Sequence, residues 1–302
     1  MKTVFRWIGI VSGVLVGLIV LAVGAVYGIT EARINRTYDI RIESVPVPTD
    51  ADAIAYGQRL VKTRGCVDCH GENLAGRVIQ ENPIAGRLVA TNLTAGRNGI
   101  AKSYTVADYV RAIRHGVGPD GRPLLFMPAH EYYFLSDADL GAMIAYLKSA
   151  PPVDSDLLPN QQVALPIRAL FLLTGQVPLL PAEWVDHNAP RPTPPAPGVT
   201  AAYGQYLAVT CIGCHGPGLA GGPIPGAPAD WPPAPNLTPS GRLSQWSEAD
   251  FIRAMRTGVT PDGTQIRNRY MPWQALGQMT DDELKALWLY LQSLPAKPTG
   301  SR

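Results

Sequence analysis

The hydrophobic pattern along the chain begins with one long apolar run near the N-terminus. Lys2 and Arg6 precede an uncharged stretch, residues 7–30, that consists mostly of Val, Leu, Ile, Ala and Gly. A bilayer-spanning helix needs roughly 20 apolar residues, whereas the apolar region of a cleaved signal peptide is usually about 7 to 15 residues long. The length therefore favours an uncleaved membrane anchor over a signal peptide. With Lys2 and Arg6 in the cytoplasm, everything after Glu31 is expected on the outer side, and a cleaved signal would place it there too.

Helical periodicity is clearest in two later segments, residues 136–149 and 280–293. Each opens with a Ser or Thr that can cap a helix, carries acidic residues in its first turn, and is followed by a proline. Apolar residues recur at helical spacing in both segments: Leu140, Met143, Ile144 and Leu147 in the first, and Leu284, Leu287, Trp288 and Leu291 in the second. The pattern predicts two helices that each bury one face.

These two segments belong to a longer repeat, because most of the chain is written twice. The matching stretches, at offsets between 142 and 147 residues, are 55–58 with 202–205, 66–71 with 211–216, 92–94 with 236–238, 107–114 with 249–256, and 127–128 with 271–272. A period this long indicates domain duplication rather than a solenoid. Each copy is expected to hold a helix leading into a cysteine motif, a loop, a middle helix, another loop and a closing helix.

The predicted fold class is therefore all-α, with two tandem domains preceded by one N-terminal transmembrane helix. The predicted boundaries are 1–30 for the anchor, 31–50 for a spacer, 51–150 for the first domain, 151–197 for a proline-rich linker, 198–296 for the second domain and 297–302 for a tail. The run 190–197 is typical of a semi-rigid, extended connector. The apolar segment 163–173 is too short to span a membrane. Packing between the two domains is the favoured interpretation of this segment, and a position on the bilayer surface is the alternative.

Size and charge add limits on the partners. A chain of 302 residues can bury two ordinary domain cores. Its formal net charge is only +2, and no basic arm or stripe is visible, so a nucleic-acid partner is not expected.

The chemistry is concentrated in the cysteine motifs. The chain has four cysteines, and all of them lie in C-x-x-C-H motifs, formed by Cys66, Cys69 and His70 and by Cys211, Cys214 and His215. This spacing attaches a haem through two thioether links while the adjacent histidine ligates the iron. A single C-x-x-C could instead be a redox disulfide or half of a zinc site, but the paired histidines and the lack of other cysteines argue against both. The motifs predict two covalently bound haem c groups.

A second iron ligand should come from a distant part of each copy. Met127 and Met271 are the candidates, since they lie in matching Met-Pro dipeptides just before the closing helices. A lone methionine is more often a core filler, so the paired placement carries the prediction. His130 is the rival ligand for the first haem, while His115 and His187 lack counterparts and are expected at the surface or at helix ends.

Other repeated residues favour structural roles. Gly57 and Gly204, next to Tyr56 and Tyr203, predict that the first helix of each copy crosses the closing helix at close range. Four arginines recur on the middle helices and are expected to be solvated, with haem propionates as the alternative partners: Arg111, Arg114, Arg253 and Arg256.

Both halves of the chain resemble class I cytochrome c domains, over roughly residues 51–150 and 198–295. The resemblance rests on a C-x-x-C-H motif followed by a Met-Pro pair before the last helix, and the tandem arrangement is similar to bacterial membrane-bound dihaem cytochromes c. It implies haem attachment after export, with the haem at the core of each domain. It also implies a role in electron transfer rather than an enzyme activity of the chain's own.

We therefore expect a single-pass membrane protein whose haem domains face the periplasm. It would transfer single electrons between a donor and an acceptor complex of a respiratory or photosynthetic chain, or from a periplasmic dehydrogenase, with no small-molecule substrate. One alternative is a dihaem peroxidase, which would need an open ligand position on one iron. A thiosulfate-oxidising enzyme would need a spare thiolate, and the chain has none. The last alternative is a structural haem subunit of a larger membrane complex.

Overall fold

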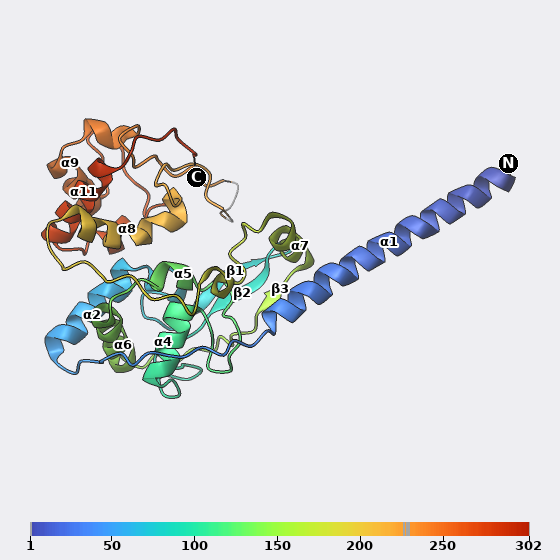
Figure 1. Cartoon of the computed structure of the whole chain (residues 1–302), viewed down its shortest axis with the longest axis horizontal. Helices are drawn as coiled ribbons and strands as arrows, with labels where there is room; N and C mark the ends of the chain where they lie inside the picture. The colour runs from blue at the N-terminus through green and yellow to red at the C-terminus, as the bar shows by residue number, and fades with distance from the viewer. Residues whose placement is uncertain (1, 226, 228–229, 302) are drawn as a thin grey trace.

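The computed structural model describes residues 2–225, 227 and 230–301. Helix α1 (Lys2–Ile34) extends away from two helical domains, and its most apolar part is not buried against them (Figure 1). Within the described residues, α1 alone is long and apolar enough to cross a membrane. It contains the whole of the predicted apolar run at 7–30.

The first domain consists of helices joined by long loops. They are α2 (Ala51–Thr63), α3 (Cys66–His70), α4 (Val106–His115), α5 (Ala129–Tyr132) and α6 (Asp137–Ser149). Helix α2 crosses α6 at Gly57, where an added Cβ would lie 1.9 Å from the carbonyl oxygen of Ala142. Only glycine permits backbones to approach this closely, so the predicted crossing is confirmed.

The second domain repeats this plan with one difference. Its elements are α8 (Ala201–His215), the 3₁₀ helix η2 (Arg242–Gln245), α9 (Glu248–Thr257), α10 (Trp273–Leu276) and α11 (Asp281–Ser293). Helix α8 runs unbroken into the cysteine motif, whereas its counterpart is split into α2 and α3 at Gly65, where φ is 78°. The first copy has two more residues between its glycine and its motif, and these form the break.

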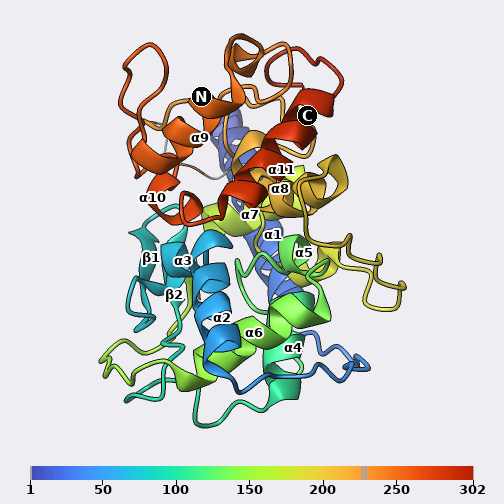
Figure 2. The same cartoon turned by 90° about the vertical axis from the view of Figure 1, so that its left-hand side faces the viewer.

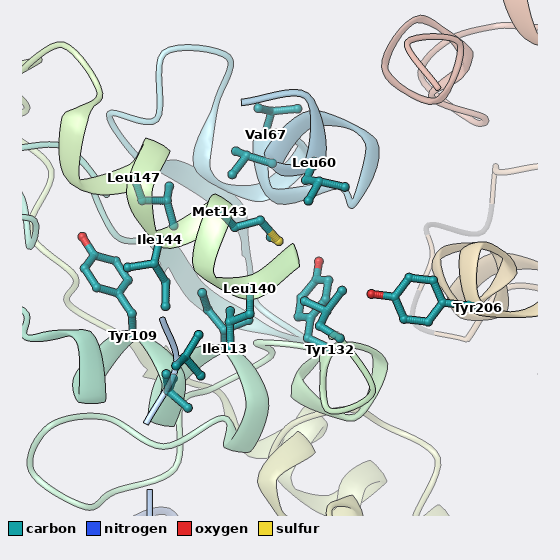
Figure 3. Close-up of a cluster of buried hydrophobic side chains, with 14 of the residues drawn as sticks. Leu60, Val67, Tyr109, Ile113, Tyr132, Leu140, Met143, Ile144, Leu147 and Tyr206 are labelled. Atoms are coloured by element: carbon teal, nitrogen blue, oxygen red, sulfur yellow. The ribbon is translucent and has the colours of Figure 1, made fainter. Parts of the chain in front are cut away.

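The predicted closing helices are confirmed, with their caps. Ser136 accepts a hydrogen bond from the Asp139 amide at the start of α6, and Thr280 accepts one from the Glu283 amide at the start of α11. The buried face of α6 packs with α2, α3 and α4 in the core of the first domain, as Leu60, Val67 and Ile113 lie around it (Figure 3).

The first domain also carries a small antiparallel sheet that the hydrophobic pattern did not predict. Its strands, in spatial order, are β1 (Arg77–Asn82), β2 (Gly86–Ala90) and β3 (Gln162–Val163). Strand β3 comes from the segment between the domains, so this pairing depends on a contact between residues far apart in the sequence. The fold remains mainly helical.

The segment between the domains is more ordered than a simple connector. After β3 it forms α7 (Leu165–Thr174) and the 3₁₀ helix η1 (Pro181–Trp184). Helix α7 packs beside the end of α1, and Phe171 joins a buried cluster with Leu179 and Leu180 against the first domain. The favoured interpretation of residues 163–173, packing between the two domains, is therefore wrong, because these residues pack on α1 and the first domain.

Candidate functional site

The first C-x-x-C-H motif forms one short helix, α3, that places its histidine in a defined orientation. The Nδ1 atom of His70 lies 2.7 Å from the carbonyl oxygen of Thr91. A carbonyl oxygen can only accept, so Nδ1 carries the proton and the lone pair of Nε2 is left for a metal. Burial lowers the pKa of His70, which favours the neutral imidazole that ligates iron.

The second motif has the same geometry at the end of α8. The Nδ1 atom of His215 lies 2.8 Å from the carbonyl oxygen of Pro235, and burial lowers the pKa of this histidine as well. Burial also raises the pKa of Cys66 and of Cys211 to about 12, because a buried thiolate is poorly solvated. Both motifs thus present thiols and a neutral imidazole.

Each candidate methionine contacts the same core cluster as the first cysteine of its motif. Met127 and Cys66 both pack against the core cluster of the first domain. Met271 and Cys211 both pack against the core cluster of the second domain. Each domain thus offers two thiols, one imidazole and one thioether, which is the donor set of a c-type haem site.

The remaining histidines meet the expectation only in part. His115 is the last residue of α4, at the expected helix end, but it is only 2% exposed, so the alternative of a surface position is wrong for it. Its Nδ1 lies 3.0 Å from that of His187, which is half-buried. The His115 ring packs against Tyr133, and the His187 ring packs against Tyr38. Only the fold brings these side chains together, so the sequence could not predict the contacts. His130 stacks edge-on against Trp184 of η1, with ring centres 4.9 Å apart.

The middle-helix arginines bind protein groups. Arg114 is fully buried, where it donates to the carbonyl oxygen of Leu135 (2.9 Å) and pairs with Asp137 (2.6 Å). Arg256 makes the matching contacts with Met279 and Asp281. The expectation of solvated side chains is therefore wrong for Arg114. Arg111 and Arg253 each pair with an aspartate three residues earlier.

The two domains meet through matching surfaces (Figure 2). Arg59 of α2 forms an ion pair with Glu283 at the start of α11. At the corresponding positions of the repeat, Tyr206 of α8 donates a hydrogen bond to Asp139 at the start of α6 (2.5 Å). A surface that contacts its own counterpart in this way has the approximate two-fold symmetry of an isologous interface.

Arg64 joins the first haem motif to the second domain. It lies two residues before Cys66 and is only 3% exposed. Its Nη1 atom is 3.3 Å from both the carbonyl oxygen of Tyr206 and the hydroxyl of Thr210, and its guanidinium lies over the Tyr206 ring. Within the first domain, the Tyr132 hydroxyl donates to the Arg64 carbonyl (2.7 Å). In Figure 3 the Tyr206 side chain points toward Tyr132 across the interface.

Glu131 of α5 lies near both motifs. Its carboxylate faces Gly213, between the two cysteines of the second motif, where an added Cβ would be 2.9 Å from Oε1. Burial, together with this carboxylate, raises the pKa of Cys214, and burial with Asp68 and Glu131 raises that of Cys69. Burial also raises the pKa of Glu131 itself to about 7. The two cysteine motifs therefore line one shared interface.

The roles of Arg64 and Glu131 at this interface were not predicted from the sequence. A signal was present in the repeat, because Arg64 and Glu131 align with Val209 and Ala275 in the second copy. A charged residue at a position where the other copy is apolar marks a place where the two copies have different surroundings.

Comparison with known proteins covers both domains. A family model described as cytochrome c matches residues 54–151 and 201–295. The cytochrome c subunit of an alcohol dehydrogenase (quinone) from Gluconacetobacter polyoxogenes is 30% identical over 280 residues, covering 82% of this chain and 58% of that protein. The fructose dehydrogenase cytochrome subunit of Gluconobacter japonicus is 28% identical, covering 84% of this chain and 55% of that protein.

A third relative matches in length as well. The diheme cytochrome c-type protein of Cereibacter sphaeroides is 26% identical over 286 residues, covering 83% of this chain and 91% of that protein. The chain spans little more than half the length of the two dehydrogenase subunits above. With two matched domains and a haem motif in each, the chain belongs to the cytochrome c family and carries two covalently bound haem c groups.

Proposed function

We propose that this protein is anchored in the membrane by α1 and, on the periplasmic side, receives electrons from a dehydrogenase for transfer to a further redox partner. The observation that carries the proposal is the placement of both cysteine motifs on one interface, around Arg64 and Glu131. Electrons that enter one domain can thereby leave through the other. Relatives named as cytochrome subunits of alcohol and fructose dehydrogenases support a dehydrogenase as the donor.

We further propose the residues that hold the two haems. Cys66 and Cys69 attach the first, and His70 and Met127 ligate its iron; the corresponding residues of the second site are Cys211, Cys214, His215 and Met271. A haem held by these residues would supply one-electron redox chemistry at its iron. Two protein ligands on each iron leave no position for a substrate, and this favours a carrier over a peroxidase.

Substitution of the two methionines tests the ligand assignment and the carrier role together. Met127→Ala and Met271→Ala should each convert one of the two haems to a high-spin form that binds carbon monoxide. Met143→Leu is the matched control, because Met143 is a fully buried methionine of the α6 core. Low-spin spectra retained in both alanine variants would refute the assignment, and rapid peroxide turnover by the wild-type protein would refute the carrier role.

The donor can be identified in native membranes. Haem reduction is followed at the Soret band after addition of an alcohol, a sugar or a sugar acid. Membranes that contain this protein are compared with membranes from a strain that lacks it. A substrate whose oxidation reduces these haems names the dehydrogenase class. If none of these substrates reduces the haems, a dehydrogenase is excluded as the electron donor.

A further inference from the structure

Helix α7 presents an apolar face to solvent beside the base of α1. Pro166, Leu170 and Leu173 are exposed at positions i, i+4 and i+7, so they lie on one side of the helix. Leu173 is 85% exposed and Leu170 is 48% exposed. Next to them, Ile84 is 65% exposed, and its carbonyl oxygen accepts a hydrogen bond from the Ile167 amide. We refer to Ile84, Pro166, Leu170 and Leu173 as the α7 face.

A buried arginine fixes α7 to α1. Arg168 is the one charged residue of α7 and is 5% exposed. It donates to the Thr30 hydroxyl (2.8 Å), pairs with Glu31 (3.0 Å), and lies over the Tyr27 ring at 4.2 Å. These contacts of Arg168 with α1 therefore fix the position of α7 along α1.

These contacts place α7 at the outer boundary of the membrane. The 20 helical steps from Trp7 to Tyr27 span about 30 Å at 1.5 Å per residue, which is the thickness of the hydrocarbon core. Both aromatic side chains are more than half exposed, as is usual for residues at the two membrane–water interfaces. Arg168 touches Tyr27, so α7 lies at the level where α1 leaves the hydrocarbon.

We propose that the α7 face is a second membrane contact, which inserts its apolar side chains into the outer leaflet beside α1. This inference rests on the proposed anchoring by α1. The face carries no charge, since the only charge of α7 is buried and paired, and it continues directly from the membrane-spanning helix. Short apolar helices of this kind lie in the interface plane rather than across the bilayer.

Two linked contacts would orient the haem domains. A single helix leaves the domains free to swing about its end, whereas α1 and α7 together define a plane. In Figure 1, α7 lies next to the base of α1 and near the small sheet of the first domain. The first domain, which α7 packs against, is thus held next to the membrane.

Site-specific photo-crosslinking of the full-length holoprotein in phosphatidylethanolamine–phosphatidylglycerol vesicles tests the inference. A p-benzoylphenylalanine residue replaces Leu173 in the test variant, Val16 within α1 in a second, and Leu289 in a third. Leu289 is the matched control, because it is an exposed leucine (40%) on α11 of the second domain. Haem spectra confirm that each variant is folded.

We expect lipid adducts, identified by mass, at positions 173 and 16, and several-fold fewer at 289. Adducts at 16 without adducts at 173 would overturn the inference and leave the anchor intact. Loss of adducts at both positions would overturn the anchor and the inference with it. Crosslinks from 173 to a second copy of the chain would assign the face to a protein contact instead.

Discussion

The hydroxyl of Tyr206 gives the most direct measure of how strongly the two haem domains are held together. It donates to Asp139 of the other domain (2.5 Å) and accepts a hydrogen bond from the Ser136 amide (3.0 Å). Burial next to Asp139 raises the pKa of Tyr206 to about 12, so the hydroxyl keeps its proton at neutral pH. The change Tyr206→Phe removes this oxygen and keeps the ring that packs on Arg64.

The expected cost follows from the two lost hydrogen bonds. A hydrogen bond to a charged group contributes about 1.5–3 kcal/mol, and a buried donor left without its partner costs about 1 kcal/mol or more. Asp139 is 7% exposed, so water cannot replace the phenol freely. We therefore expect Tyr206→Phe to lower the free energy of unfolding by about 3 kcal/mol.

Urea unfolding of the holoprotein, followed at the Soret band, measures this change. Tyr203→Phe is the matched control, because Tyr203 is a buried tyrosine stacked on Tyr206 whose hydroxyl has no hydrogen bond among the described residues. It should shift the free energy by less than about 0.5 kcal/mol. Equal losses in the two variants, or no loss in Tyr206→Phe, would show that the interface hydrogen bond is not stabilising.

Two further predictions concern the helix crossing and the buried histidines. Gly204→Ala should lower the yield of holoprotein and cost about 3 kcal/mol of stability, because its Cβ would lie 1.9 Å from the Ala286 carbonyl oxygen. Burial, with His187 nearby, lowers the pKa of His115 to about 4. The unfolded chain, with a histidine pKa near 6.5, then binds more protons between pH 6.5 and 4, so acidification over this window should remove about 3 kcal/mol of stability.

Each of these has a control within the chain. Gly13→Ala lies in α1 with no atom near the new Cβ and should leave holoprotein yield unchanged. Equal yields from the Gly13 and Gly204 variants would contradict the close crossing. For the histidine, His115→Asn should flatten the pH dependence of the thermal midpoint between pH 6.5 and 4. An unchanged slope in that variant would mean that other groups cause it.

The parts of this protein that the sequence could predict are those encoded locally. The helix ends followed from Ser136 and Thr280, because a capping side chain and its amide lie within one turn. The haem motifs were predictable for the same reason, since attachment and ligation come from consecutive residues. Gly57 and Gly204 could be assigned to a crossing because the repeat showed each in the same setting.

What the sequence could not predict depends on contacts between distant segments. Whether α7 packs on α1 or between the domains depends on Arg168 meeting Thr30, residues far apart in the chain. Burial of Arg114 was missed because a helix-surface arginine is usually solvated, and only the fold brings Leu135 and Asp137 to it. Ligation of the haem irons by Met127 and Met271 stays a prediction, which the methionine variants test.

The matching surfaces of the two domains have a consequence for how they can change. In a dimer of identical chains, one pair of residues must serve both halves of a two-fold interface. Here the halves are covalently joined, at effective concentrations in the millimolar range, so weaker contacts suffice to hold them. One half is free to use the ion pair of Arg59 and Glu283, while the other uses the hydrogen bond of Tyr206 and Asp139. Fusion therefore lets the surroundings of the two haems be tuned one at a time.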